Sequence, residues 1–411
     1  MRENAEAQKP WIIIRSSIEP YPADYGARVR IWALGKALSQ EYRVALVMSR
    51  PPEYGEALRE VFAGVWFNPT LSPSGSKLTP RGLLRRLSDR RRIRSAKQAY
   101  DSLFTPFEGN PLVGANHMIA EELDRLCVEL RPVAIIAEYV TNAVPAIPIA
   151  RRHGISAIID THDVWSIRRQ RESEAGVASK IAFEDSDEER LLQLADALIA
   201  IQPLEAEVLQ RMAPDATVLV AEHPIDIVDT PDVPVDPNTV LFVGSKAHHN
   251  VFALTRFVAE QWHVVQDTLP TARLRVVGNI VEGVDEKTRT AENVEFVGFA
   301  EDVHLEYARA ALVVNPAVYG SGLKIKSVEA LAHGRPLLST PVGIEGLEDG
   351  SDCAFVTAPF DGLGSRIVEL LRNRERLDAL GTGSRAFARE RFSSERCFGP
   401  LMDYLRGIRR N

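Results

Sequence analysis

The stretch of residues 315–336 holds the side chains best suited to chemistry in this chain. A predicted strand leads there through a glycine loop into a short predicted helix, Leu323–His333. Gly320 and Gly322 flank Ser321 in the loop, and glycine allows the backbone to approach a ligand closely. The start of the helix would offer free N–H groups and the positive end of its dipole. The pattern therefore predicts a site for an anion such as a phosphate.

Three charged side chains of the same helix extend this interpretation. Lys324 and Lys326 add positive charge to the first turn, and Glu329 follows one turn beyond Lys326 on the same side. An anion cradle followed by a carboxylate suits a nucleotide, with the diphosphate at the helix start and the ribose hydroxyls on Glu329. The same residues also fit an ordinary loop and helix with a Lys326–Glu329 ion pair on the surface.

The composition limits the class of protein. A chain of 411 residues exceeds the usual size of one hydrophobic core, so two domains are expected. The net charge of −7 argues against bulk binding of nucleic acid. Cys127, Cys353 and Cys397 are far apart, which indicates a reducing compartment without a disulfide framework or a cysteine metal site. The first residues lack an apolar leader and no apolar run is long enough to span a bilayer, so we expect a cytoplasmic protein.

Short apolar runs alternate with helical patterns, which predicts an α/β architecture with parallel sheets. In the first half the predicted strands are Trp11–Arg15, Arg43–Met48, Val61–Phe67, Val133–Ala137, Ser156–Asp160, Ala197–Ile201 and Thr217–Val220. In the second half they are Val240–Val243, Leu274–Val277, Val294–Val297, Ala311–Asn315, Pro336–Ser339 and Ala354–Val356. The predicted helices include Ala27–Ser39, Met118–Leu130, Glu184–Leu194, Asn250–Asp267, Asp302–Ala308, Gly362–Arg372 and Ser394–Ile408. Residues 222–237 carry four prolines and read as a linker between two doubly wound domains. Such sheets bind ligands beyond the carboxyl ends of their strands, so a cleft between the domains is the expected site.

Seven segments of the second half, in this order, resemble the nucleotide-sugar domain of GT-B glycosyltransferases, in particular the retaining family four (glycosyl transferases group 1). They are residues 241–245, 249–250, 274–278, 294–299, 311–316, 320–336 and 340–347. The first half resembles the family's acceptor domain more loosely, through residues 20–28, 160–163 and 195–200.

The resemblance implies a GT-B fold of two Rossmann-like domains facing each other across a cleft. Residues 1–222 would form the acceptor-binding domain and 223–237 a proline-rich hinge. Residues 238–390 would form the nucleotide-sugar domain, and 391–411 a helix that crosses back to the first domain.

The resemblance also assigns roles around the donor. Glu329 matches the glutamate that holds the nucleotide ribose, and Lys324 and Lys326 are candidates for stabilising the leaving diphosphate, hence for catalysis. Many relatives carry an arginine where this chain has Ser245, and a glutamate that contacts the donor sugar where it has Ser321. The donor-binding residues implied in this way are Gly26, Gly244, Ser245, Lys246, Phe299, Gly320, Ser321, Gly322, Leu323 and Glu329. Phe299 would lie by the base, or else be an ordinary core residue.

In the first half, the resemblance points to His162 as a catalytic residue that orients the acceptor hydroxyl or the donor sugar. Asp163, Arg28 and Glu138 are acceptor-binding candidates. Arg28 and its neighbour Arg30 would meet an anionic acceptor or line a solvated helix face.

The expected enzyme is a retaining, metal-independent hexosyl- or deoxyhexosyltransferase of bacterial polysaccharide biosynthesis. It would move a sugar from a nucleoside diphosphate to a hydroxyl of a glycan, lipid-linked glycan or small metabolite, with no cofactor. The sequence leaves open a GT-B phosphorylase, a sugar epimerase and a non-catalytic nucleotide-sugar binder. The basic segment Arg81–Lys97, with interleaved leucines, would let the protein sit on the inner, anionic face of a membrane, or be a solvated helix.

Overall fold

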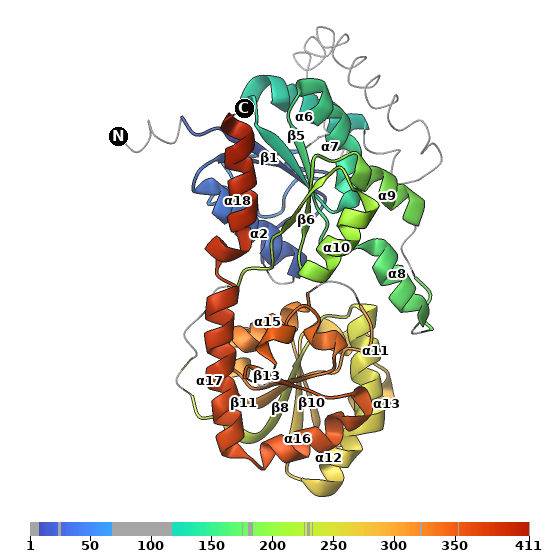
Figure 1. The fold of residues 1–411 in the computed structure, drawn as a ribbon. Coiled ribbons are helices and arrows are strands. Elements are labelled where there is room, and N and C mark those ends of the chain that lie inside the picture. The colour runs from blue at the N-terminus through green and yellow to red at the C-terminus, as the bar shows by residue number, and fades with distance from the viewer. Residues whose placement is uncertain are drawn as a thin grey trace. The chain divides into compact units, whose positions relative to one another are not determined.

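The computed structural model describes residues 8–23, 26–67, 117–174, 176–179, 184–225, 227, 231, 233–320, 323–351 and 353–410 (Figure 1). Contacts within the chain divide it into two compact units. The first unit comprises residues 1–166, 181–222 and 398–411, and the second comprises 167–180 and 223–397. The segment 167–180 thus lies with the second unit, although the sequence analysis places it in the first domain.

The first unit contains one parallel sheet in the strand order β3-β2-β1-β4-β5-β6-β7. Its strands are β1 (Trp11–Ser16), β2 (Arg43–Met48), β3 (Gly64–Phe67), β4 (Ala134–Glu138), β5 (Ser156–Asp160), β6 (Ala197–Ala200) and β7 (Thr217–Val220). The predicted α/β architecture is confirmed. Strand β4 is buried at every residue, which explains why it reads as a continuous apolar run without alternation.

Helices cover this sheet and complete its core. They are α2 (Gly26–Ser39), α3 (Gly55–Leu58), α6 (His117–Leu130), α7 (Val140–His153), α9 (Asp185–Gln193), α10 (Pro203–Met212) and most of α18 (Ser394–Arg410). Phe398, Leu401 and Leu405 of α18 belong to the same buried cluster as Ile14 of β1 and Ile136 of β4. Their spacing of three and four residues places them on one face of α18, and this face packs into the hydrophobic core of the first unit.

The second unit contains a second parallel sheet, in the order β10-β9-β8-β11-β12-β13. Its strands are β8 (Asp236–Val243), β9 (Arg273–Val277), β10 (Val294–Gly298), β11 (Ala310–Asn315), β12 (Leu337–Ser339) and β13 (Phe355–Thr357). From β8 the chain adds β9 and β10 on one side of the sheet, and then returns to add β11, β12 and β13 on the other side. The topological switch point therefore lies between β8 and β11. Strand β8 begins at Asp236, inside the segment predicted as a linker.

The helices of the second unit include α8 (Trp165–Glu174) from residue 167 onward, α11 (His248–Phe257), α12 (His263–Thr268), α13 (Glu286–Arg289), α14 (Val303–Arg309), α15 (Ile325–Ala332), α16 (Leu363–Leu371) and α17 (Arg374–Arg391). A π-helical turn, Val258–Trp262, joins α11 to α12. The helix predicted at Asn250–Asp267 is therefore three consecutive helical segments. Two loops leave the carboxyl edge at the switch point, after β8 and after β11, and the second leads into α15.

Candidate functional site

Glycines bring the backbone together at the carboxyl ends of β8, β9 and β10. The N–H of Gly244 donates to the carbonyl of Val277 at 2.9 Å, and that of Gly278 donates to the carbonyl of Gly298 at 2.6 Å. Gly278 has a φ of +110°, and a Cβ there would collide with the Gly244 carbonyl. This edge therefore requires glycine and presents main chain where other residues would place side chains.

Helix α15 begins at Ile325 with Lys324 as its N-cap, two residues later than predicted. Its first turn is anchored to the sheet by the buried amide of Asn315, which donates to Ser327 Oγ at 2.8 Å and to the Gly343 carbonyl at 3.2 Å. The start of α15 is thus held at the end of β11. Of the predicted loop residues, Ser321 and Gly322 lie outside the described part of the chain.

Lys326 points into the second unit and does not pair with Glu329. Its amine donates to Asn250 Oδ1 and lies 5.1 Å from the centre of the Phe242 ring. Burial, and then repulsion from Lys324, lowers the pKa of Lys326 to about 7. In the described part of the structure no carboxylate lies within ion-pair distance of this amine. The alternative prediction of a Lys326–Glu329 ion pair on the surface is therefore wrong.

Glu329 is oriented by Tyr307, whose hydroxyl donates to Oε2 at 3.1 Å. Tyr307 in turn stacks on His333, with ring centres 4.2 Å apart, and His333 Nδ1 hydrogen-bonds to the Glu329 carbonyl. Burial raises the pKa of Glu329, and the Tyr307 hydrogen bond and Lys326 oppose this shift. Its second oxygen, Oε1, has no hydrogen-bond partner among the described residues and is not fully buried.

A residue that the sequence analysis missed holds the glycine loop. Arg171 of α8 donates to the Gly320 carbonyl at 2.7 Å and to both carboxylate oxygens of Glu345. Lys324 Nζ lies 3.9 Å from Glu345, and its side chain passes Gly320. No sequence motif marks Arg171, because its contacts are about 150 residues away along the chain.

Positive charge accumulates around the start of α15. The pKa of His249 is lowered to about 3, first by burial and then by repulsion from Lys326, Arg168 and Lys324. The local field therefore disfavours adding another positive charge and favours an anion.

The other donor-site candidates have different surroundings. Asn250 Nδ2 donates to the carbonyl and the hydroxyl of Ser245, at 3.2 Å each. The amine of Lys246 pairs with Glu282 at 2.7 Å, with both side chains more than half exposed. Phe299 is 76% exposed, which excludes the alternative that it is a core residue. Leu323 is buried.

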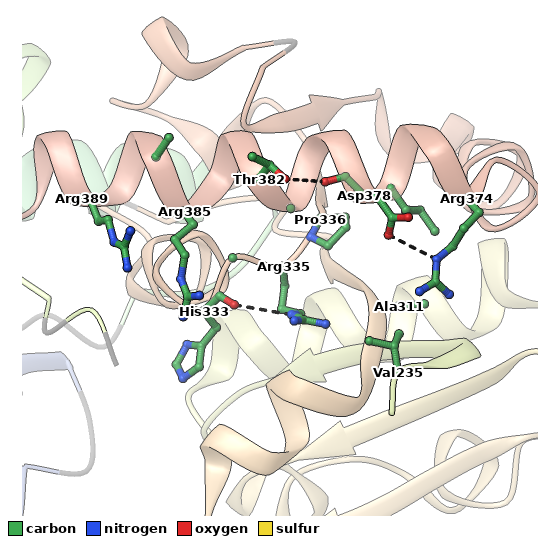
Figure 2. A pocket seen from close by; sticks show the side chains of 14 residues that line it. Val235, Ala311, His333, Arg335, Pro336, Arg374, Asp378, Thr382, Arg385 and Arg389 are labelled. Atoms are coloured by element: carbon green, nitrogen blue, oxygen red, sulfur yellow. Dashed lines mark hydrogen bonds and ion pairs between the residues drawn. The ribbon is translucent and has the colours of Figure 1, made fainter. Parts of the chain in front are cut away.

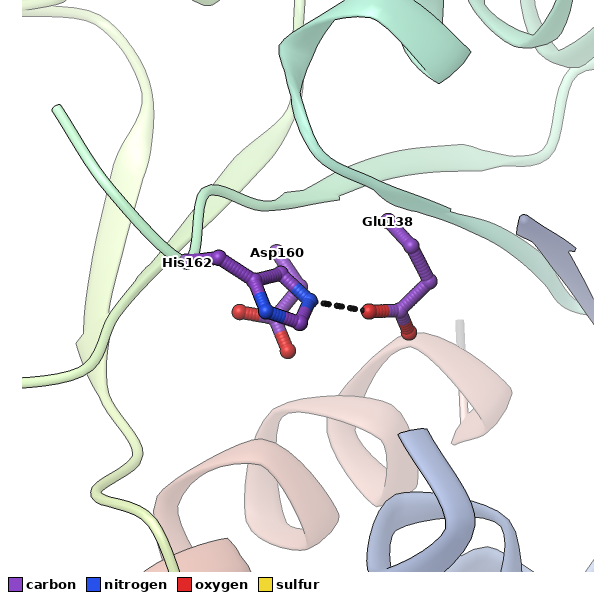
Figure 3. Close-up of side chains that lie close together, drawn as sticks. All are labelled: Glu138, Asp160 and His162. Carbon is purple, nitrogen blue, oxygen red and sulfur yellow. Dashed lines mark hydrogen bonds and ion pairs between the residues drawn. The ribbon is translucent and has the colours of Figure 1, made fainter. Parts of the chain in front are cut away.

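In the first unit, three predicted or neighbouring polar side chains meet at the carboxyl ends of β4 and β5. Glu138 ends β4 and pairs in register with Asp160, which ends β5, and His162 follows two residues later. His162 Nε2 lies 2.6 Å from Glu138 Oε2, and both side chains are buried (Figure 3). Burial above all raises the pKa of Glu138; the hydrogen bond to His162 opposes this shift, and the charge of Asp160 adds to it.

Arg30 is neither an acceptor contact nor part of a solvated face. Its guanidinium makes two hydrogen bonds to Asp160, at 2.8 and 3.0 Å, and donates to the carbonyls of Ala221 and Glu222. It is buried with Asp160, so the pair is structural. One oxygen or nitrogen each from Glu138, Asp160 and His162 lies within 4.8 Å of the others, as in a metal site. Because Arg30 already occupies both oxygens of Asp160, these residues fit a cation poorly.

The remaining first-unit candidates are Gly26, Arg28 and Asp163. Gly26 is the first residue of α2, and Arg28 is half-buried and donates to the Pro22 carbonyl at 3.4 Å. Asp163 is half-buried, and its N–H donates to the Thr161 carbonyl at 2.6 Å.

A hollow of about 550 Å³ lies at the opposite end of α15 from the glycine loop (Figure 2). Its lining includes His333, Arg335, Arg374, Asp378, Arg385 and Arg389. Arg335 donates to backbone carbonyls, and Arg374 pairs with Asp378 at 3.2 Å. Neither Glu329 nor the two lysines line this hollow, so it is distinct from the candidate site.

The basic segment Arg81–Lys97 lies outside the described residues. Among the helices that the structure does describe, none combines the length and apolar character needed to cross a bilayer.

Comparison with known proteins supports the resemblance. Residues 237–373 match the model of the family Glycosyl transferases group 1. A Klebsiella pneumoniae protein described as an uncharacterized 44.6 kDa protein in the cps region is 23% identical over 173 residues, which are 39% of this chain and 44% of that protein. The chain thus matches less than half the length of this relative.

Solved structures match over nearly the whole chain. Sucrose-phosphate synthase from Thermosynechococcus elongatus has a TM-score of 0.71 at 17% identity, over 98% of this chain and 99% of that one. Anabaena HepE in complex with UDP has a TM-score of 0.66 at 14% identity, over 97% and 100%. HepE has also been solved with UDP-glucose.

The two parallel sheets and these matches define a protein with the GT-B fold. Within it, the second unit resembles the glycosyltransferases of group 1, as the sequence motifs indicate.

Proposed function

We propose that this protein is a glycosyltransferase that binds a nucleoside diphosphate sugar in its second unit, at the carboxyl edge beside α15. The observation that carries the proposal is Lys326, an inward-pointing amine with a lowered pKa and no carboxylate partner in the described structure. A diphosphate beside this amine would stabilise its charged form. Lys324, at the N-cap of α15, adds a second cation at the helix end whose dipole favours an anion.

Glu329 would hold the nucleotide ribose. Tyr307 already donates to one of its oxygens, and the other has no partner in the part of the chain that the structure describes and is not among its fully buried polar atoms. A carboxylate oxygen of this kind accepts a hydrogen bond from a ribose hydroxyl. The exposed ring of Phe299, at the end of β10, is available to a base, and HepE, which shares the fold, is known in complex with UDP.

The transfer would retain the configuration of the sugar and use a hydroxyl of a glycan, lipid-linked glycan or metabolite as acceptor. Cations fixed at the start of α15 would stabilise charge on the leaving diphosphate without a metal. Activity that disappears with a chelator and returns with a divalent cation would contradict the metal-independent mechanism.

The test is thermal stabilisation by UDP-, GDP-, dTDP- and ADP-glucose. A ligand at about a hundred times its Kd should add about 2.7 kcal/mol to the free energy of unfolding. We expect one nucleotide family to stabilise the wild type and Glu329→Ala to lose the effect. Glu369→Ala, which removes an exposed carboxylate of α16, is the matched control and should keep it. Stabilisation by none of the four would refute the donor site.

Turnover separates a transferase from a non-catalytic binder, because only the transferase releases nucleotide in the presence of acceptors. Given inorganic phosphate, release of sugar phosphate would instead indicate a phosphorylase. The proposed place of action is the cytoplasm, with peripheral contact at an anionic membrane through Arg81–Lys97. Failure to sediment with anionic vesicles at physiological salt would contradict that contact.

A further inference from the structure

The cluster at the ends of β4 and β5 holds a histidine in an unusual backbone conformation. His162 has a φ of +57° and Tyr139 a φ of +66°, although neither is glycine. Such residues cost on the order of 1–3 kcal/mol each and persist only where the surroundings hold them. Here the two rings stack, with centres 4.1 Å apart and planes 11° from parallel, and the Tyr139 N–H donates to the Asp160 carbonyl. Strain concentrated at the end of two adjacent strands suggests a functional orientation of His162.

The hydrogen bonds around His162 fix one nitrogen and leave the other available. Nε2 is 2.6 Å from Glu138 Oε2. Nδ1 has no hydrogen-bond partner among the described residues, and it is not one of the fully buried polar atoms. The imidazole therefore has Nδ1 available for a further hydrogen bond.

Among the described residues that can carry positive charge, His162 is the one that hydrogen-bonds to the Glu138 side chain. Its side chain is 0% exposed, and Oε1 is buried without a hydrogen bond. The other carboxylate, Asp160, is neutralised by Arg30 through two hydrogen bonds. Because Glu138 has no exposed oxygen, it cannot make the direct acceptor contact expected from the sequence.

We propose that Glu138 is a positioning residue that holds the His162 imidazole with the proton on Nε2, so that Nδ1 accepts a hydrogen bond from a sugar or acceptor hydroxyl. Glu138 acts through His162 and does not touch the substrate. His162 would orient the attacking hydroxyl, and Nδ1 would take its proton as the oxygen bonds to the anomeric carbon, the sugar–phosphate bond breaks and the nucleoside diphosphate leaves. This role rests on the proposed glycosyl transfer.

The first measurement needs no substrate. Two-bond ¹H–¹⁵N spectra of ¹⁵N-histidine-labelled protein report which imidazole nitrogen carries the proton, and His162→Gln assigns the signal. We expect the Nε2–H tautomer of His162 in the wild type and a mixture of tautomers in Glu138→Gln. The Nδ1–H tautomer in the wild type, or an unchanged tautomer in Glu138→Gln, would overturn the proposal.

The second measurement is nucleotide release from UDP-, GDP-, dTDP- and ADP-glucose. Glu138→Gln should lower kcat by roughly a hundredfold, with a change in donor KM below about twofold. The matched control is Glu205→Gln, a buried carboxylate of α10 in the same unit, which should keep the wild-type kcat. Equal kcat in both variants would overturn the positioning role.

Failures of the two proposals are distinguishable. Absence of donor binding by the wild type would refute the proposed function, while the tautomer of His162 would still decide whether Glu138 holds the ring. If the wild type binds a donor but Glu138→Gln keeps the wild-type kcat and the same His162 tautomer, only the positioning role of Glu138 is refuted.

Discussion

We predict that Lys326 makes the affinity for a nucleotide sugar depend on pH. Burial, and then repulsion from Lys324, lowers its pKa from the ordinary 10.5 to about 7, and among the described residues no carboxylate lies within ion-pair distance of the amine. A bound diphosphate would favour the charged amine, so binding above pH 7 requires the uptake of a proton. We predict that affinity is constant well below pH 7, where the amine is already charged, and falls as the pH rises through 7.

The size of this effect follows from the population of the charged amine. Between pH 7 and pH 9 the charged fraction falls from about one half to about one hundredth, so Kd should rise about fiftyfold, or about 2.3 kcal/mol. A nucleotide sugar is the suitable probe because its diphosphate is esterified at both ends and stays fully ionised over this range.

The assay is calorimetric titration at pH 6, 7, 8 and 9 with the nucleotide sugar that stabilises the wild type. Lys326→Arg keeps a positive charge at every pH, so it should bind without this pH dependence. The same exchange at the exposed Lys287 of α13 is the control and should follow the wild type. A wild-type Kd that stays constant from pH 6 to pH 9 would refute the assignment of Lys326 to the diphosphate.

Three further predictions concern the supports of the two sites. Arg30→Met should cost about 3–5 kcal/mol in urea unfolding, because it leaves Asp160 buried without its partner, and an unchanged midpoint would contradict this. Gly278→Ala should lower Tm because the added Cβ would collide with the carbonyl oxygen of Gly244. Gly399→Ala, where no atom lies within 4 Å of the added Cβ, should leave Tm unchanged. Arg171→Ala should raise the donor Kd about tenfold in calorimetry through loss of its bonds at the glycine loop, and a wild-type Kd would exclude that role.

Much of the fold is predictable because buried parallel strands leave a clear apolar signal. Strands are found at the predicted residues Arg43–Met48, Ser156–Asp160 and Thr217–Val220. Helix α7 lies between the strands predicted at Val133–Ala137 and Ser156–Asp160, although Pro145 and Pro148 lie inside it and proline ordinarily interrupts a helix. Its residues from Asn142 to Ala150 are all buried, so tertiary packing outweighs the local preference.

The candidate site is predictable only where its residues are close in sequence. Lys324, Lys326 and Glu329 share one loop and helix, so their association is visible in the motif. Their orientation depends on distant partners: Lys326 meets Asn250 and not Glu329, which no local spacing reveals. Arg171 reaches the loop from 149 residues away and has no sequence signal at all.

The assignment of residues 167–180 to the second unit has a consequence for the exchange of domains between related enzymes. The chain passes from one unit to the other after residues 166, 180, 222 and 397. A chimaera joined at residue 222 would therefore take Arg171 from the foreign half and leave Gly320 and Glu345 to the resident one. Recombination at the predicted linker therefore separates Arg171 from its hydrogen-bond partners Gly320 and Glu345. A hybrid that keeps the donor loop intact needs junctions after residues 166, 180 and 222, so that residues 167–180 come from the same parent as residues 223–397, and a fourth junction after residue 397 keeps α18 with the first unit.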